Sequence, residues 1–302
     1  MSFVIAHLSD PHLGPVPRPQ LKDLTLKRAM GFANWKRGRE RLNDMAMLDR
    51  LVEDLRAQHP DHIAMTGDIV NIALPAEFVP ATRWMHQLGD PADVSFTPGN
   101  HDAYVRSAVA QLDEAFSPWT SSDSSYRRSA RFPFVRRRQD IVVIGLGSGV
   151  ATAPLMATGY LGASQLEDLA GLLRRFAKDN VARVILIHHP PLEKGQAWPR
   201  RLIDAAALAQ IVAEYGAELI LHGHNHEQMI HSLHSPRAKT PNGQIIVLGA
   251  PSASSISHRA DQRAAYYLVK LDDHDDFWRV SARARGLLPN SEAIGELPPL
   301  HL

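Results

Sequence analysis

The 302-residue chain contains no cysteine, so disulfide bonds, thiolate zinc sites and cysteine nucleophiles are excluded. It also lacks any apolar run close to the roughly 20 residues that a membrane-spanning helix requires. Its first residues lead directly into an apolar segment, without a charged leader or a cleavage site, and we expect no signal peptide. Neither charge sign dominates, because 33 Lys and Arg stand against 32 Asp and Glu. We expect a globular protein that is cytoplasmic, with association at a membrane surface as an alternative.

Histidine, in contrast, is frequent, and much of it lies in short polar motifs that follow apolar runs. The chain has 16 histidines. Apolar runs at residues 3–8, 62–66, 94–97, 184–187 and 219–221 are typical of buried strands. The motifs that follow them are, in order, Ser9-Asp10-Pro11-His12, Gly67-Asp68, Gly99-Asn100-His101-Asp102, His188-His189-Pro190 and Gly223-His224-Asn225-His226.

These motifs combine carboxylate, amide and imidazole groups without any thiol. Ligand sites in α/β proteins form at the carboxyl ends of the strands, so we expect the motifs to meet at one edge of a sheet. Oxygen and nitrogen ligands of this kind suit manganese, iron or zinc. The sequence therefore predicts a metal site built from five strand ends.

The order of the elements predicts an α/β protein. A further apolar run at residues 141–146 is typical of a buried strand. Helical periodicity occurs at residues 42–58, 76–88, 164–176 and 204–215, the third opening with a capping-box pattern at Ser164. Residues 244–248, 265–271 and 277–284 are typical of strands with no helices between them. We expect one domain of two packed sheets over residues 1–288 and an irregular tail over 289–302.

Residues 14–41 form a basic and apolar insertion after the first motif, with an expected helix break near Gly31. It has eight basic and two acidic residues, and six large apolar ones: Leu21, Leu24, Leu26, Met30, Phe32 and Trp35. One interpretation is a cap packed on the domain; the other is a surface for an anionic substrate or a membrane. A second basic run, the arginines of residues 127–138, follows the central motif. Such a run is usually a solvated face; the alternative here is that it borders the site.

The ordered motifs, over residues 5–226, resemble those of the calcineurin-like metallophosphoesterases, most of all the bacterial branch of cyclic-nucleotide and glycerophosphodiester phosphodiesterases. The resemblance implies a four-layer αββα sandwich of two mixed β-sheets flanked by helices. It implies one metal held by Asp10, His12 and His226, a second held by Asn100, His188 and His224, and Asp68 between them. His101 would face the leaving group, with Asp102 behind it, whereas His189 and His222 are expected to be structural.

The function we expect is that of a dinuclear-metal-dependent phosphodiesterase acting on a small phosphate ester such as a cyclic nucleotide. Attack would come from a metal-bound hydroxide, and the two divalent or mixed-valence ions would be manganese, iron or zinc. The alternative is a membrane-peripheral pyrophosphatase of a nucleotide-linked lipid precursor, with residues 14–41 against the lipid. We rank a nuclease or a non-catalytic scaffold lower and expect no nucleic-acid partner. Whether the chain forms a homo-oligomer stays open.

Overall fold

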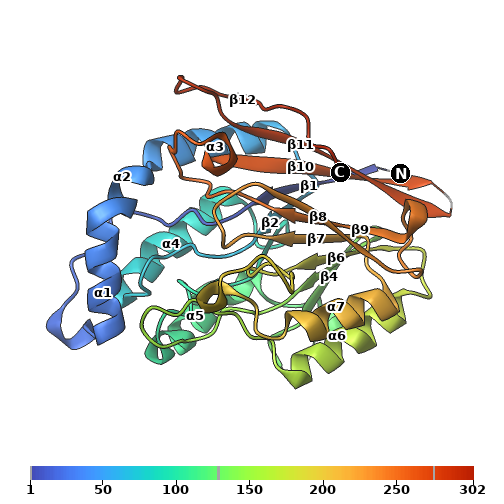
Figure 1. Ribbon diagram of the computed structural model, residues 1–302, viewed down its shortest axis with the longest axis horizontal. Helices are drawn as coiled ribbons and strands as arrows, with labels where there is room; N and C mark the ends of the chain where they lie inside the picture. The colour runs from blue at the N-terminus through green and yellow to red at the C-terminus, as the bar shows by residue number, and fades with distance from the viewer. Residues whose placement is uncertain (1, 128–129, 275) are drawn as a thin grey trace.

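The computed structural model describes residues 2–127, 130–274 and 276–302, and its two six-stranded sheets pack face to face (Figure 1). The first sheet has the order β12-β11-β10-β1-β2-β3, with β1 (Ser2–Leu8), β2 (His62–Met65), β3 (Val94–Phe96), β10 (Ala265–His274), β11 (Phe277–Leu287) and β12 (Ile294–Glu296). The second has the order β4-β5-β6-β7-β9-β8, with β4 (Phe134–Arg138), β5 (Ile141–Gly145), β6 (Ala182–Leu186), β7 (Leu219–His222), β8 (Met229–His234) and β9 (Gln244–Gly249).

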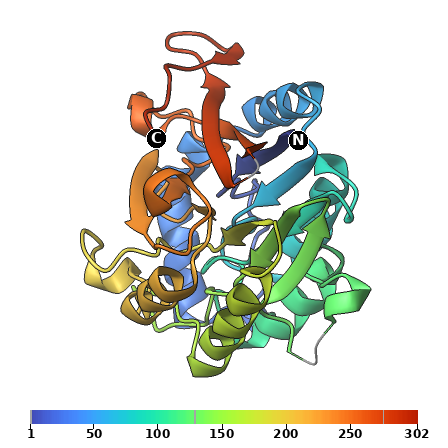
Figure 2. The ribbon, with the colours of Figure 1, turned by 90° about the vertical axis from the view of Figure 1, so that its right-hand side faces the viewer.

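Helices cover both outer faces, which confirms the predicted αββα sandwich (Figure 2). The α-helices are α1 (Leu26–Asn34), α2 (Glu40–Leu42), α3 (Met45–Ala57), α4 (Pro75–Leu88), α5 (Val109–Phe116), α6 (Ala163–Phe176) and α7 (Ala205–Tyr215). Apolar side chains of α3 and α4 pack on the first sheet, and those of α6 and α7 on the second. A third apolar cluster lies between the sheets, where Ile5 faces side chains such as Leu186 and Leu221.

Parallel pairing brings the motif-bearing strand ends to one edge. Strands β1, β2 and β3 are parallel neighbours, and so are β5, β6, β7 and β9. Backbone hydrogen bonds then join the first two motif loops, because Asp10 N donates to Gly67 O over 3.0 Å and His12 N donates to Asp68 O over 3.1 Å. The first two motif loops are therefore one hydrogen-bonded unit.

Four elements lie where the sequence predicted none: β4, α5, β8 and β12. Strand β12 falls in the tail that was expected to be irregular, and it pairs with β11. Strand β4 was not predicted because its arginines are not typical of a buried strand. Arg136 is nevertheless buried, and its guanidinium donates to the backbone carbonyls of Pro91 and Val94, each over 2.6 Å. The capping box expected at Ser164 is also absent, since α6 begins after Gly162 without a side-chain cap.

The insertion at residues 14–41 folds as a cap. Helix α1 passes through Gly31 without the predicted break. A Cβ at this position would lie 2.4 Å from the Tyr104 hydroxyl, so the glycine lets helix α1 and Tyr104 pack closely. A wider π-helical turn follows over Trp35–Arg39. Trp35 is buried in an apolar cluster with Ile72, whereas Leu21 is 90% exposed. Part of the apolar insertion thus packs on the domain and part faces solvent. No helix in the described residues is long and apolar enough to cross a membrane.

Candidate metal centre

Asp10, His12, Asp68 and His226 bring their donor atoms together at the strand ends of both sheets. These atoms all lie within 4.8 Å of one another. The Nε2 atoms of His12 and His226 are 3.0 Å apart, and Asp10 Oδ1 lies 3.2 Å from His226 Nε2. Lone pairs that converge in this way on one point suit a cation.

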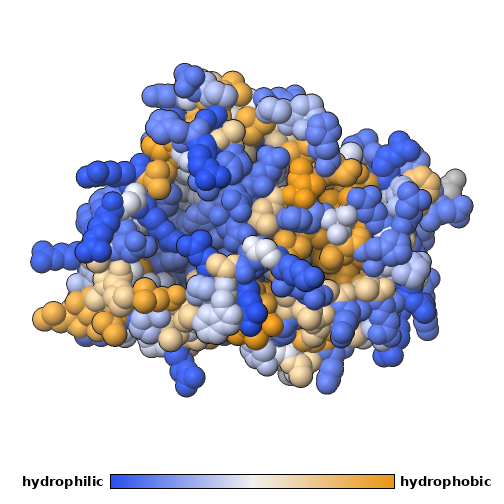
Figure 3. All heavy atoms as spheres, in the orientation of Figure 1, coloured by the Kyte–Doolittle hydropathy of each residue, from blue (hydrophilic) through white to orange (hydrophobic). Residues whose placement is uncertain are grey.

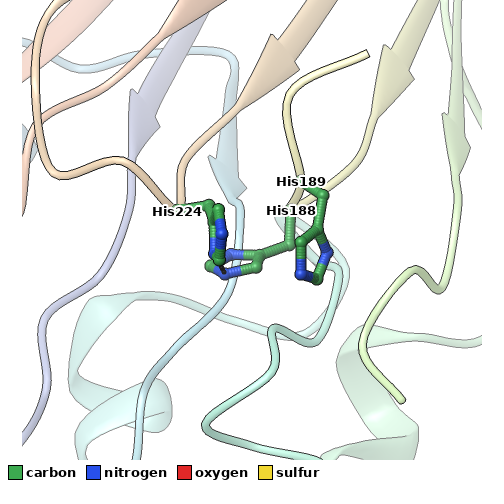
Figure 4. A group of neighbouring side chains, drawn as sticks. All are labelled: His188, His189 and His224. Carbon is green, nitrogen blue, oxygen red and sulfur yellow. Dashed lines mark hydrogen bonds between the residues drawn. The ribbon is translucent and has the colours of Figure 1, made fainter. Parts of the chain in front are cut away.

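A second group of donors meets around His188. Its Nε2 atom lies 3.3 Å from Asn100 Oδ1, 3.3 Å from His224 Nδ1 and 3.3 Å from Asp68 Oδ2. Figure 4 shows the His188 ring directed towards His224, with the two residues following neighbouring strands β6 and β7. The structure thus brings together all seven residues for which a metal-ligand role was predicted.

Asp68 belongs to both groups, because its Oδ2 atom is also 3.9 Å from His12 Nε2. Its other oxygen, Oδ1, accepts a hydrogen bond of 2.7 Å from the His101 backbone N–H. Among the described residues, this carboxylate contacts both clusters, which is the position that a bridging ligand would need.

The backbone of the centre is strained where the metal-type residues stand. Positive φ values occur at five of them: Asp10 (51°), His12 (43°), Asp68 (57°), His224 (75°) and His226 (57°). Each such residue costs on the order of 1–3 kcal/mol, so the surrounding structure must impose these conformations. Gly99 adds a close approach, because a Cβ there would lie 2.1 Å from Asp68 Oδ1.

Hydrogen bonds aim the donors inwards and leave some of them unpaired. His188 Nδ1 donates to Thr66 O over 2.6 Å, which directs Nε2 to the centre. Asp10 Oδ2 accepts from His224 N over 3.0 Å, whereas Asp10 Oδ1, which lies 3.2 Å from His226 Nε2, is buried without a hydrogen-bond partner in the described residues. Buried polar atoms are normally satisfied, so these residues fit a bound divalent ion.

The pKa shifts of the histidines in the centre also favour a bound cation. Burial holds the pKa of His12 and of His224 well below the usual range, and neutral imidazole is the ligand form. Burial opposes a charge on His188, but the charge and hydrogen bond of Asp68, the charge of Asp10 and the hydrogen bond to Thr66 together raise the pKa of His188 to about 9. The field that attracts a proton to His188 would equally attract a metal cation.

His189 lies close to His188 and His224 but has other partners. Its Nδ1 atom pairs with Ser148 Oγ at 2.8 Å, and its Nε2 atom lies 3.2 Å from Ala157 O. Its ring also packs against His224 at 4.4 Å between centroids. With both nitrogens engaged, His189 has the structural position that the sequence predicted.

The predicted contact between Asp102 and His101 is wrong. The Asp102 carboxylate instead accepts hydrogen bonds of 2.8–3.1 Å from the backbone N–H groups of residues 68, 69, 70 and 99. It points into the loop that holds Asp68, away from the imidazole. Burial and the charge of Asp68 raise its pKa to about 7, against the four N–H groups that favour the ionised form.

The backbone carbonyl of Asn71, rather than the Asp102 carboxylate, is the hydrogen-bond partner of the His101 ring. His101 Nδ1 donates to the Asn71 carbonyl, and on this tautomer His101 Nε2 accepts from Arg39 Nη1 over 2.8 Å. Sequence reasoning missed both partners. The position of the insertion was the available signal for Arg39, because a segment that leaves the end of the first strand must pass over the strand-end edge.

A cavity of about 840 Å³ opens above the centre, and Figure 3 shows hydrophilic side chains around the hollow. The cap and the loops after β5 and β6 form its walls. Its lining includes four cations, Lys27, Arg37, Arg39 and Arg200, and apolar side chains such as Met30 and Leu155. Within the described residues, no arginine of the 127–138 run lines this cavity, so the alternative that the run borders the site does not hold there; Arg128 lies outside the described residues.

An αββα sandwich with two clusters of metal-type ligands at its strand ends defines a metal-dependent phosphoesterase. The sequence profile described as "Calcineurin-like phosphoesterase" matches residues 3–228, and the chain belongs to this family.

Two curated relatives are similar to the chain. A 3′,5′-cyclic-nucleotide phosphodiesterase of Nostoc sp. is 28% identical over 212 residues, which cover 69% of this chain and 67% of the relative. A probable cyclic nucleotide phosphodiesterase of Synechococcus sp. is 24% identical over 288 residues, covering 92% and 91%.

Two solved structures share the fold. A dimetal phosphatase from Danio rerio superimposes with a TM-score of 0.60 at 13% identity, over 95% of this chain and 97% of the other. A purple acid phosphatase from yellow lupin superimposes with a TM-score of 0.57 at 11% identity, over 95% and 52%.

Proposed function

We propose that this chain is a dinuclear-metal-dependent phosphodiesterase that hydrolyses a small diester, with a cyclic nucleotide as the first candidate. The single observation that carries the proposal is the sharing of Asp68 between two donor clusters. Asp10, His12 and His226 would hold one ion, Asn100, His188 and His224 the other, and Asp68 both. Such ions, when bound, activate water and stabilise charge on phosphoryl oxygens.

The substrate class rests on the cavity and on the relatives. A volume of about 840 Å³ is ample for a nucleotide. Both similar curated proteins are named as cyclic nucleotide phosphodiesterases. The role of His101 on the leaving-group side stays a prediction, because proton donation would require a proton on Nε2, the atom that accepts from Arg39 here.

One observation favours a second candidate, the pyrophosphatase of a nucleotide-linked lipid precursor at a membrane surface. Exposed apolar side chains stand on the cap and on facing loops: Leu21 is 90% exposed, Leu26 70%, Leu155 83% and Trp198 63%. They would suit an acyl chain that leaves the cavity. A substrate panel separates the two candidates, since only the lipid enzyme would prefer a nucleotide-diphospho-lipid to a cyclic nucleotide.

The test of the metal assignment compares Asp68→Ala and Asn100→Ala with the parent protein. We expect Asp68→Ala to lose both ions and Asn100→Ala to lose mainly one, with a parallel fall in Mn²⁺-dependent hydrolysis of cyclic nucleotides. Metal content is measured by mass spectrometry of the dialysed protein. Two retained ions and normal turnover in both variants would show the assignment to be wrong.

A further inference from the structure

Arg39 reaches the centre from the cap, 62 residues away in sequence from the histidine that it contacts. One of its N–H groups donates to His101 Nε2 over 2.8 Å. Its Nε and Nη2 groups make no hydrogen bond to any described part of the chain, and the side chain lines the cavity beside Asp68 and Asn100. The guanidinium therefore presents unused donors next to the candidate metal ligands.

The cap holds Arg39 firmly in this place. The π-helical turn that carries it begins at Trp35, which is 3% exposed and packs with Ile72 and Leu74. Arg28 of the same insertion donates to the backbone carbonyls of Ile72 and Ala73, and so ties α1 to the domain. A cation fixed before the substrate arrives needs little reorganisation when charge develops during the reaction.

The charge of the cavity identifies what Arg39 would bind. Four cations line it, and Asp68 is the one carboxylate among its described lining residues. Of these four cations, Arg39 is the one that donates a hydrogen bond to His101 of the central motif in the described residues. A planar guanidinium with two free donor groups matches two oxygens of a phosphoryl group.

We propose that Arg39 is a catalytic residue that donates hydrogen bonds from Nε and Nη2 to the non-bridging oxygens of the scissile phosphate, with His101 positioning its guanidinium. The inference rests on the proposed phosphodiesterase function. In the reaction, the oxygen of water adds to phosphorus, one P–O ester bond breaks, and a proton from the water ends on the leaving oxygen, so that a phosphomonoester and an alcohol result. Arg39 forms and breaks no covalent bond in this step; it stabilises the charge on the oxygens.

The test uses the Mn²⁺-loaded full chain and three variants: Arg39→Ala, Arg39→Lys and, as a control, Arg41→Ala. Arg41 is exposed in the same segment and does not line the cavity. The substrate is bis(p-nitrophenyl) phosphate, and inorganic phosphate binding is measured by titration calorimetry. Metal content and thermal unfolding are measured on every variant.

We expect Arg39→Ala to lose about 10²-fold in kcat/KM and to bind phosphate about tenfold more weakly, with its metal content unchanged. Arg39→Lys should recover only part of both losses, because an ammonium group cannot offer two parallel donors. Arg41→Ala should match the parent. Unchanged kcat/KM and phosphate affinity in Arg39→Ala would overturn the proposal, and so would a rate loss explained by lost metal.

The same experiment separates this inference from the function on which it rests. A parent protein that binds phosphate through Arg39 but hydrolyses no diester would overturn the phosphodiesterase proposal while leaving Arg39 as an anion-binding residue. An active parent whose phosphate affinity does not depend on Arg39 would overturn the role of Arg39 alone.

Discussion

At the scale of single residues, Asp102 shows that a motif residue can stabilise the loops that hold the metal-type ligands. Its carboxylate gathers four backbone N–H groups from two motif loops, and so holds Asp68 and Asn100 in place. We expect Asp102→Asn to lower the free energy of unfolding by about 3 kcal/mol, because an amide leaves some buried N–H groups without an acceptor. Urea denaturation of the metal-free protein measures this difference.

The matched control for Asp102 is Asp49→Asn, an exposed residue of α3, which should stay within about 0.5 kcal/mol of the parent. If Asp102→Asn instead keeps its stability and loses rate only on substrates with poor leaving groups, then Asp102 acts on His101 after all. The two results differ in the metal-free protein, where catalysis plays no part.

The residues of the centre could be predicted from the sequence, but their hydrogen-bond partners could not. The seven metal-type residues share an order and a place after apolar runs, which a sequence shows directly. The partners of Asp102 and His101 are backbone groups, and their directions depend on loop conformations with positive φ at residues such as Asp68. The type of a side chain does not indicate whether a backbone N–H or carbonyl faces inwards.

At the scale of elements, the cap depends on one aromatic anchor. Trp35 is buried at the start of the turn that carries Arg39, against Val16, Ile72 and Leu74. We expect Trp35→Ala to lower the free energy of unfolding by about 3–5 kcal/mol, because truncation of a buried ring leaves a cavity. Turnover should fall as well, since Arg39 loses its support. Leu21→Ala, at a side chain that is 90% exposed, is the control and should change stability little.

A cap that melts on its own would give a different outcome. In that case Trp35→Ala would leave the main unfolding transition unchanged and would increase proteolysis within residues 14–41. Limited proteolysis followed by mass spectrometry distinguishes this result from global destabilisation.

Strands with continuous apolar runs were predictable, including β3 at a sheet edge, whereas the edge strands that carry polar side chains were not. Strands β5, β6 and β7 are buried on both faces and read as apolar runs. Strands β4, β8 and β12 lie at the ends of the sheet orders and carry polar side chains. Their pairing partners, rather than their own composition, decide that they are strands.

At the scale of the whole molecule, the centre joins the two sheets. Asp10, Asp68 and Asn100 follow strands of the first sheet, whereas His188, His224 and His226 follow strands of the second. Ions that bind only this assembled arrangement favour the folded state. We expect Mn²⁺ at about 100 times its dissociation constant to add about 2.7 kcal/mol to the free energy of unfolding. This gain corresponds to a rise of about 5 °C in Tm.

Differential scanning fluorimetry after chelation and after Mn²⁺ addition measures this shift. Sodium chloride at equal ionic strength is the control and should reproduce little of it. An Asp68→Asn variant should lose most of the shift, because both clusters lose a shared ligand. A Tm that does not respond to Mn²⁺ in the parent protein would contradict an ion-binding centre between the sheets.

Both chain termini lie on the side of the molecule that faces away from the cap (Figures 1 and 2). Leu300 and Leu302 pack against the apolar cluster that contains Phe3, near the start of β1, whereas the cavity opens beyond the end of that strand. Immobilising the protein on a support through a peptide tag at either end would therefore leave the cavity open to solution. A biosensor for phosphate esters could be built on this orientation without changing any residue of the cap.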